Sequence, residues 1–201
     1  YNAFGYGLFT GGLSFEEAAR HARERLAIPM SVVPASNQLG ASFEAAMAQH
    51  RRSIELFEPT ILCATPSMAF ALWEEGLLEG FEAIITGGEP SSAALRALLK
   101  GLGERVVIQV YGLSEIIGPG VAQSCREGRL HLNEDAFGVE FSEHELVIST
   151  RHNEAMPRVR YRTGDAVTRV SCSCGNTHQA IEVHGRDEDF IAALGLYLFQ
   201  L

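Results

Sequence analysis

The sequence feature that most constrains the fold is a short apolar stretch that leads directly into polar residues. Val106–Val110 are mostly β-branched and apolar, with a glycine a few positions away on each side, and this pattern predicts a buried strand. Tyr111, Ser114 and Glu115 follow almost at once. Open α/β sheets bind ligands at the carboxyl ends of their strands. There a ring can stack on a base, a hydroxyl can donate to a phosphate and a carboxylate can hold Mg²⁺. The alternative is a strand followed by an ordinary loop.

The two parts of the chain show different periodicities, which predict different architectures. Before the central strand, helical and strand-like patterns alternate, with strands expected at 28–33, 60–63 and 83–86 and helices at 14–26, 43–57, 68–75 and 91–100. The first helix is expected to open at the capping box of Ser14 and Glu17. Such alternation predicts an α/β fold with a parallel sheet and flanking helices. Later stretches at 138–141, 145–150, 158–161 and 166–170 predict a small β subdomain.

The predicted domain organisation has three parts. Residues 1–120 are expected to form the α/β subdomain, residues 121–185 the small β subdomain, and residues 186–201 a hinge with the start of a further domain. Because the chain begins at a tyrosine and ends in an apolar run, we expect it to be a piece of a longer protein.

Composition narrows the classes of partner. The net charge of −9 and pI near 5.3 argue against nucleic acid or an anionic membrane surface. The sequence shows neither a signal peptide nor an apolar run of membrane-spanning length. Its four cysteines lack a secreted-type framework, which favours a reducing, cytoplasmic location.

Three further motifs predict ligand contacts. The segment 4–12 alternates aromatic residues with glycine, which suits an apolar wall against a closely approaching backbone. Gly87 and Gly88 follow a predicted strand and leave room for a planar ring. Asp165 follows a Thr-Gly turn, where a carboxylate can accept both hydroxyls of a ribose. The alternatives are glycine-rich turns with core rings, a plain strand–helix junction and a solvated aspartate.

Cysteine spacing predicts a metal site in the β subdomain. Cys125 and His131 lie close together, and Cys172 and Cys174 follow about forty residues later. Three thiols and an imidazole form a complete tetrahedral set for structural Zn²⁺. His178 is a rival fourth ligand, and four unrelated buried side chains are the alternative.

The motifs together resemble those of the adenylate-forming enzymes, and within them the phenylacetate–CoA ligase family. The resemblance rests on Tyr-Gly-Leu-Ser-Glu at 111–115 with Gly-Pro-Gly at 118–120, and on 4–12, 87–90, 160–165 and 185–186 in the family's order. It implies the central part of the large N-terminal domain of such an enzyme. The implied reaction activates an aryl or arylacetic acid with ATP and Mg²⁺ through an acyl-adenylate, then forms a thioester with CoA. For the assembly of the protein we consider a homodimer.

The same resemblance implies roles for individual residues. Tyr111 would stack on adenine, Ser114 would reach the α-phosphate, Glu115 would hold Mg²⁺, and Asp165 and Arg186 would fix the ribose. The rest of the implied nucleotide pocket is Gly87, Gly88, Glu89, Pro90 and Gly112. The implied acyl pocket is Phe4, Phe9, Gly87, Gly88 and Pro119. Some members of the branch carry zinc where the cysteines lie.

The chain also departs from the family pattern. Lys100 is its single lysine and matches neither the phosphate loop nor the C-terminal lysine that adenylation uses. Gly88 stands where the family usually has alanine, which leaves space for a ring substituent. Residues 1–201 alone are therefore expected to bind AMP weakly without forming acyl-adenylate at a useful rate. The alternative to an enzyme is a non-catalytic nucleotide- or acyl-binding segment.

Overall fold

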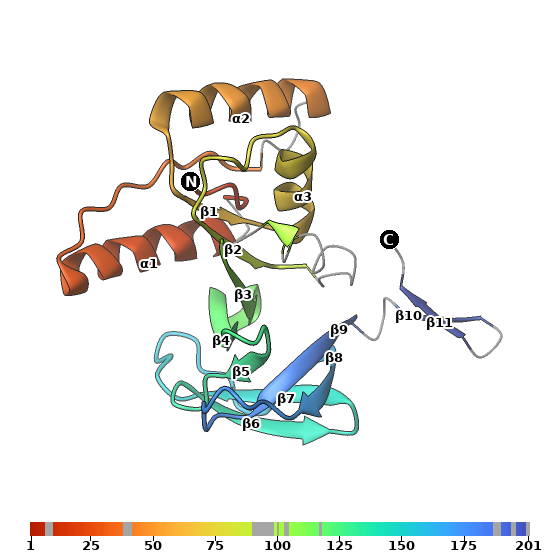
Figure 1. Ribbon diagram of the computed structural model, residues 1–201. Coiled ribbons are helices and arrows are strands. Elements are labelled where there is room, and N and C mark those ends of the chain that lie inside the picture. The colour runs from red at the N-terminus through yellow and green to blue at the C-terminus, as the bar shows by residue number, and fades with distance from the viewer. Residues whose placement is uncertain are drawn as a thin grey trace. The chain divides into compact units, whose positions relative to one another are not determined.

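The computed structural model describes residues 1–6, 10–37, 42–89, 99, 101–102, 105–116, 118–186, 190–193 and 196–199. The chain divides into two compact units (Figure 1). One comprises Tyr1–Gln109 with Ile117–Pro119, and the other comprises Val110–Ile116 with Gly120–Leu201.

Among the residues that the structure describes, the first unit contains helices and the parallel start of the sheet. They are α1 (Thr10–Leu26), α2 (Phe43–Phe57), α3 (Pro66–Glu74), β1 (Ile61–Ala64), β2 (Ala83–Gly87) and the beginning of β3 (Val106–Leu113). β1 and β2 pair in parallel. Ser42 and Thr65 cap α2 and α3 through their hydroxyl oxygens, and a proline in the first turn favours the start of α3. The core packs α2 and α3 with β1 and β2 and includes Met47, Leu62, Leu72, Phe81 and Ile84.

Two predictions in this unit are wrong. α1 begins at Thr10, so Ser14 lies inside the helix, where its hydroxyl donates to the Thr10 carbonyl at 2.7 Å instead of capping. Residues 28–33 are not a strand. The N-terminal segment takes the position beside β1: the amide of Asn2 donates to the Val33 carbonyl and that of Ala3 to the Cys63 carbonyl. Pairing with this stretch is reduced to a single bridge at Pro34.

The second unit is built from antiparallel strands. They are β4 (Gly118–Ser124), β5 (Leu130–Leu132), β6 (Phe137–Ser142), β7 (Glu145–Thr150), β8 (Tyr161–Val170) and β9 (Ala180–Arg186). Its core includes Val121, Leu132, Leu146, Ile148 and Ile181. β10 (Phe190–Ala193) and β11 (Leu196–Phe199) form an antiparallel hairpin.

The predicted parallel sheet with a separate small β subdomain is only partly right. The strands follow one another in a single nine-stranded sheet in the order β1-β2-β3-β4-β5-β9-β8-β7-β6. Parallel pairing holds for β1 and β2, whereas every pair from β4 to β6 in that order is antiparallel. The fold is therefore mixed α/β, with strands from both halves in one sheet.

Strand ends also differ from the prediction. β3 extends to Leu113 and so contains Gly112, and it is half-buried rather than buried, with Val106 56% exposed. Ser114–Ile116 form the short 3₁₀ helix η1. The strand predicted at 158–161 is absent up to Tyr161, because Arg160 has a φ of 50° that a strand does not accommodate. Within the part of the chain that the structure describes, no helix has the length and apolar character that crossing a bilayer requires.

Candidate functional site

Asp165 lies at the centre of a polar cluster in the second unit. The Tyr111 hydroxyl donates to its Oδ2 at 2.5 Å, and Arg186 Nε lies 3.5 Å from its Oδ1. Arg186 also places Nη2 3.7 Å from Glu115 Oε1. Asp165 is 6% exposed and lies inside β8, so it is not the solvated turn residue that the sequence left open. Four residues predicted for one ligand are thus close together.

Burial controls the protonation of this cluster. Desolvation raises the pKa of Asp165 above its ordinary value, and the Tyr111 hydrogen bond and the Arg186 charge lower it only in part. Burial and the neighbouring Asp165 raise the pKa of Tyr111, so the phenol stays a donor. Two carboxylate oxygens offer about four lone-pair sites. Asp165 therefore retains acceptor capacity for the hydroxyls of a ligand.

The pairing of β8 and β9 brings Arg186 to Asp165. Asp165 and Arg186 are direct partners across the two antiparallel strands, and side chains of opposed residues on one face lie close enough to interact. The sequence motifs containing the two residues are therefore adjacent through strand register.

Arg158 is a cation near this cluster that the sequence analysis missed. Its Nε donates to the carbonyl oxygen of Glu115 at 3.3 Å. Its backbone is fixed by Thr150: Arg158 N donates to Thr150 Oγ1 at 2.9 Å, and Thr150 N donates to the Arg158 carbonyl at 2.9 Å. The guanidinium also lies 5.8 Å from the ring centroid of Tyr161. In the sequence, only its position shortly before the Tyr-Arg-Thr-Gly-Asp stretch could have suggested it.

The predicted acyl-pocket residues that are described belong to the first unit. Phe4 is 6% exposed and stacks on Phe15 with ring centroids 4.6 Å apart. Gly88 has a φ of +82°, and a Cβ there would lie 3.8 Å from Phe4 Cε1 and 3.9 Å from Thr65 Cγ2. Phe15, which the aromatic–glycine motif did not include, is part of this apolar wall. The methyl group missing at Gly88 leaves free space beside Phe4.

Glu89 contacts the start of α3 in the first unit. Its carboxylate accepts from Ser67 N at 3.0 Å and from Ser67 Oγ at 2.8 Å. An acidic group at a helix N-terminus satisfies free amides and complements the helix dipole. This contact fixes Glu89, the residue directly after Gly87 and Gly88, and so helps to hold the conformation of the glycine turn.

Other predicted residues can be placed only in part. Phe9 and Pro90 lie outside the described residues, as do Lys100 and the side chain of Pro119. Gly118 is described: a Cβ on it would lie 2.4 Å from Ser14 Oγ, and its φ is +106°. The positive φ favours glycine at this position, and a Cβ would also displace the Ser14 hydroxyl.

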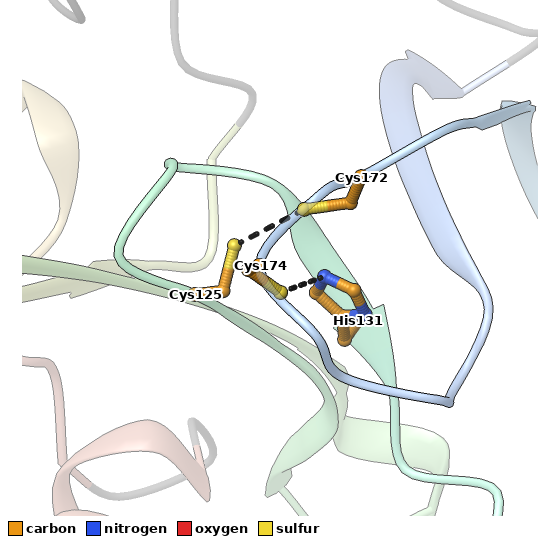
Figure 2. Close-up of side chains that lie close together, drawn as sticks. All are labelled: Cys125, His131, Cys172 and Cys174. Atoms are coloured by element: carbon orange, nitrogen blue, oxygen red, sulfur yellow. Dashed lines mark hydrogen bonds between the residues drawn. The ribbon is translucent and has the colours of Figure 1, made fainter.

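The four residues predicted for zinc come together in the second unit (Figure 2). Cys125 follows β4 and His131 lies in β5, while Cys172 and Cys174 lie between β8 and β9. Their ligand atoms all lie within 4.8 Å of one another. Cys125 Sγ and Cys172 Sγ are 3.6 Å apart, and Cys174 Sγ lies 3.4 Å from His131 Nε2.

These distances fit a tetrahedral metal site. Zinc–sulfur and zinc–nitrogen bonds of the usual length place two sulfurs about 3.8 Å apart and a sulfur and a nitrogen about 3.6 Å apart. The cysteines are free thiols, and the sulfur separation is too long for a disulfide. The donor set and its spacing therefore suit structural Zn²⁺.

The surroundings of Cys125, Cys174 and the imidazole prepare these groups as ligands. His131 Nδ1 lies 2.9 Å from the His178 carbonyl oxygen, which accepts only, so Nδ1 carries the proton and Nε2 offers its lone pair to a metal. Asn176 N donates to Cys174 Sγ at 3.4 Å. Burial raises the pKa of Cys125, but backbone hydrogen bonds from Arg129 and Glu127 and the two neighbouring thiols outweigh it and lower the pKa to about 6. At Cys172 a backbone hydrogen bond from Cys174 lowers the pKa, but desolvation and the side-chain hydrogen bonds with Cys174, Cys125 and Glu127 outweigh it and raise the pKa to about 12.

Neither the rival ligand His178 nor the remaining cysteine, Cys63, is among the four clustered residues. His178 Nδ1 lies 2.9 Å from the Leu132 carbonyl oxygen and its Nε2 lies 3.8 Å from Asp135, so the rival ligand faces other partners. Cys63 lies in β1 of the first unit, where burial raises its pKa to about 11. It behaves as a small, partly buried hydrophobe.

Sequence comparison finds phenylacetate–coenzyme A ligases among known proteins. None of the protein-family models matches the chain. The chain is 36% identical over 224 aligned positions to a phenylacetate–coenzyme A ligase of Thermus thermophilus, with 99% of this chain and 47% of that protein covered. It is 33% identical over 220 positions to a phenylacetate–coenzyme A ligase of Escherichia coli, covering 98% and 47%. The chain thus spans about half the length of the curated relatives it matches.

Solved structures share the fold. A 2-hydroxyisobutyryl-CoA ligase in complex with R3-HIB-AMP superimposes with a TM-score of 0.76 at 16% identity, covering 98% of this chain and 46% of that one. An anthranilate CoA ligase in complex with anthranoyl-AMP gives a TM-score of 0.53 at 14% identity, covering 78% and 34%. At these identities the likeness concerns the fold alone.

Proposed function

We propose, from the premise that this chain belongs to the superfamily of adenylate-forming enzymes, that it forms the nucleotide- and acid-binding part of an AMP-forming acid–thiol ligase. The substrates would be ATP, an aryl or arylacetic acid and CoA, as in a phenylacetate–CoA ligase. In the first step the acid carboxylate attacks the α-phosphorus of ATP, forming the acyl–phosphate bond and releasing pyrophosphate. In the second, the CoA thiolate attacks the acyl carbon and AMP leaves.

The cluster around Asp165 is the observation that carries this proposal. A buried carboxylate with spare acceptor sites suits the two ribose hydroxyls, and Arg186 holds its other side at 3.5 Å. Tyr111, fixed by its 2.5 Å hydrogen bond to Asp165, would present its ring to the base. The ribose and base of one nucleotide would thus be bound by residues that also hold one another.

Phosphate binding is assigned to the neighbouring groups. Ser114 would donate to the α-phosphate, and Glu115 would hold Mg²⁺, which neutralises phosphate charge as the carboxylate oxygen attacks. The guanidinium of Arg158, 3.3 Å from the Glu115 carbonyl, would add a cation on that side. An oriented donor at a developing charge is worth on the order of 10²–10³ in rate.

The acid is assigned to the apolar wall of the first unit. Phe4, stacked on Phe15, offers a ring face, and Gly88 lacks the methyl group that would lie 3.8 Å from it. An aromatic acid carrying a ring substituent would fill this space. We expect such acids to be preferred over acetate or a long fatty acid.

The three cysteines and His131 would hold a structural zinc ion. All four ligand positions would come from the protein, which leaves none for a substrate. The ion would therefore stabilise the second unit and take no part in the chemistry.

A pyrophosphate-release assay on the full-length protein with a panel of acids tests the function. Substituted aryl and arylacetic acids should turn over fastest, and Glu115→Gln should abolish most of the activity. Glu140→Gln makes the same charge change at an exposed strand position paired with Arg160 and is the matched control. Preferred turnover of acetate, or full activity in Glu115→Gln, would refute the proposal.

A binding segment without catalysis is the second candidate, and the lysine count favours it for residues 1–201 alone. Lys100 is the single lysine in the sequence, and superfamily adenylation uses two. Calorimetry with AMP beside a pyrophosphate assay on this segment separates the candidates. Weak AMP binding without pyrophosphate release is expected, and robust release would contradict this assignment.

A further inference from the structure

β8 carries an irregularity at the position of Asp165. Glu145 pairs with Ala166 and Val147 pairs with Arg162 across β7 and β8. The segment 163–165 therefore lies opposite Leu146 alone, which makes it a bulge. Bulges bend a strand and redirect its side chains, and they are frequent beside active sites. Here the redirected side chain is that of Asp165.

The carboxylate of Glu145 closes this bulge from β7. Its Oε1 accepts from Gly164 N at 2.8 Å, and its Oε2 accepts from Arg162 Nε at 2.6 Å. The Glu145 side chain is 7% exposed, whereas that of Arg162 is 75% exposed. A buried carboxylate is tolerated only when its oxygens are paired. Glu145 is therefore held by the bulge and in turn fixes it.

Gly164 and Thr163 also shape the bulge. Gly164 has a φ of +71°, a conformation outside the extended region of a strand. Thr163 supplies a second connection, because its hydroxyl donates to the Leu146 carbonyl at 2.8 Å and accepts from Asp165 N at 3.1 Å. Without the Glu145 carboxylate, the Gly164 amide and the Arg162 guanidinium would lose their common acceptor.

We propose that Glu145 is a positioning residue that sets ribose recognition through the bulge carrying Asp165. This inference rests on the proposed function, in which Asp165 accepts the ribose hydroxyls. Asp165 meets the Tyr111 hydroxyl at 2.5 Å and Arg186 at 3.5 Å. A shift of the bulge displaces the Asp165 oxygens from both partners and from the ribose.

The ribose hydroxyls supply a selective readout. We would measure the affinity of the full-length protein for AMP and for 2′,3′-dideoxy-AMP, which lacks both hydroxyls. The wild type should prefer AMP. Glu145→Leu introduces an apolar side chain of similar size and so removes both acceptor oxygens. This variant should lower the affinity for AMP about 10-fold or more, which is the usual loss for a hydrogen bond to a charged group. Its affinity for dideoxy-AMP should stay within about twofold, because that ligand does not use Asp165.

Two further variants complete the test. Glu145→Asp keeps the charge but shortens the side chain, so it should show an intermediate loss for AMP alone even if Glu145→Leu fails to fold. Glu140→Leu removes a carboxylate from the exposed side of β6 and should leave both affinities unchanged.

The outcomes separate this inference from the proposed function. A wild type without preference for AMP would refute the ribose role of Asp165 and, with it, the inference. A wild-type preference that survives in Glu145→Leu, or in Glu145→Asp where the leucine variant does not fold, would overturn the inference alone. Equal losses for both nucleotides would show that Glu145 serves stability rather than ribose recognition, and would also overturn it.

Discussion

Removing one ligand of the cysteine–histidine cluster should measurably lower the stability of the protein. The informative variant is Cys174→Ser, because Cys174 Sγ lies 3.4 Å from His131 Nε2 and sits between β8 and β9. A serine hydroxyl is a poor zinc ligand, so the remaining three side chains should bind the ion weakly. The perturbation is confined to the loop and leaves the sheet pairings in place.

The size of the effect follows from the loop that the metal closes. Cys125 and Cys172 are 47 residues apart in sequence. A cross-link closing a loop of this length stabilises the folded state by about 4 kcal/mol on chain-entropy grounds. For a folding unit of about 150–250 residues that corresponds to a fall in melting temperature of about 8–16 °C. The apolar core that includes Val121, Leu132 and Ile181 remains, so we expect a destabilised protein rather than an unfolded one.

The assay combines metal analysis with thermal unfolding of the full-length protein. Wild type should contain about one zinc per chain and lose melting temperature on dialysis against a chelator. Cys174→Ser should contain little zinc and respond little to the chelator. Cys63→Ala, which removes the cysteine in β1 of the first unit, is the control and should keep both the zinc and the chelator response. A wild type that contains no zinc and melts unchanged in chelator would refute the reasoning.

Three further predictions concern the binding residues. Because burial raises the pKa of Asp165 and ribose hydroxyls donate to the charged carboxylate, adenosine affinity should fall as the pH falls through a value above the ordinary aspartate range. Asp165→Asn should remove that dependence, and identical pH profiles for the two proteins would contradict the assignment. Arg158→Met should lower AMP affinity about 10-fold, as expected for a hydrogen bond to a charged group, while leaving adenosine affinity within about twofold; equal losses would show a structural role. Gly88→Ala adds a methyl 3.8 Å from Phe4 at a φ of +82°, so it should cost about 1 kcal/mol of stability. It should also raise the KM for ring-substituted acids about 10-fold. If the order of preference among the acids stayed the same, the assignment of Gly88 to the acid pocket would be refuted.

The sequence was most informative where a local pattern determines a local structure. The apolar runs at 60–63 and 83–86 predicted β1 and β2, and the helical face from Phe43 to Phe57 matches α2. The cysteine spacing predicted a cluster that the fold assembles from two separate loops. For the strands and the helix the local residue pattern decides the outcome, whereas the cluster also depends on the fold that brings residues 43 and 47 positions apart together.

Where long-range partners decide, the sequence was silent or misleading. Ser14 has the pattern of a cap, but α1 begins earlier. Val33 lies in a strand-like stretch, but the backbone of Asn2 occupies the position beside β1 where that stretch was expected to pair. The continuation of one sheet through both halves depends on edge pairing that local periodicity does not specify.

The candidate site shows the same division. Asp165 and Arg186 were proposed from their motifs, and their direct pairing arises from the register of β8 and β9. Glu145 and Arg158 were missed, because an acidic residue at the start of a strand and an arginine in a loop carry no local signal. Their contacts join residues 19 and 43 positions apart.

One strand, β9, has the cysteine–histidine cluster at one end and the proposed nucleotide site at the other. Ala180, its first residue, pairs with His131, and Arg186, its last, pairs with Asp165. Seven extended residues span about 20 Å. Oxidation or chelation at the thiols would loosen the beginning of β9, and amide hydrogen exchange should report the loss of protection spreading toward Arg186. Under the proposed assignments, a preparation that loses its metal during purification would therefore bind nucleotide poorly, although none of the side chains proposed to bind nucleotide had been altered.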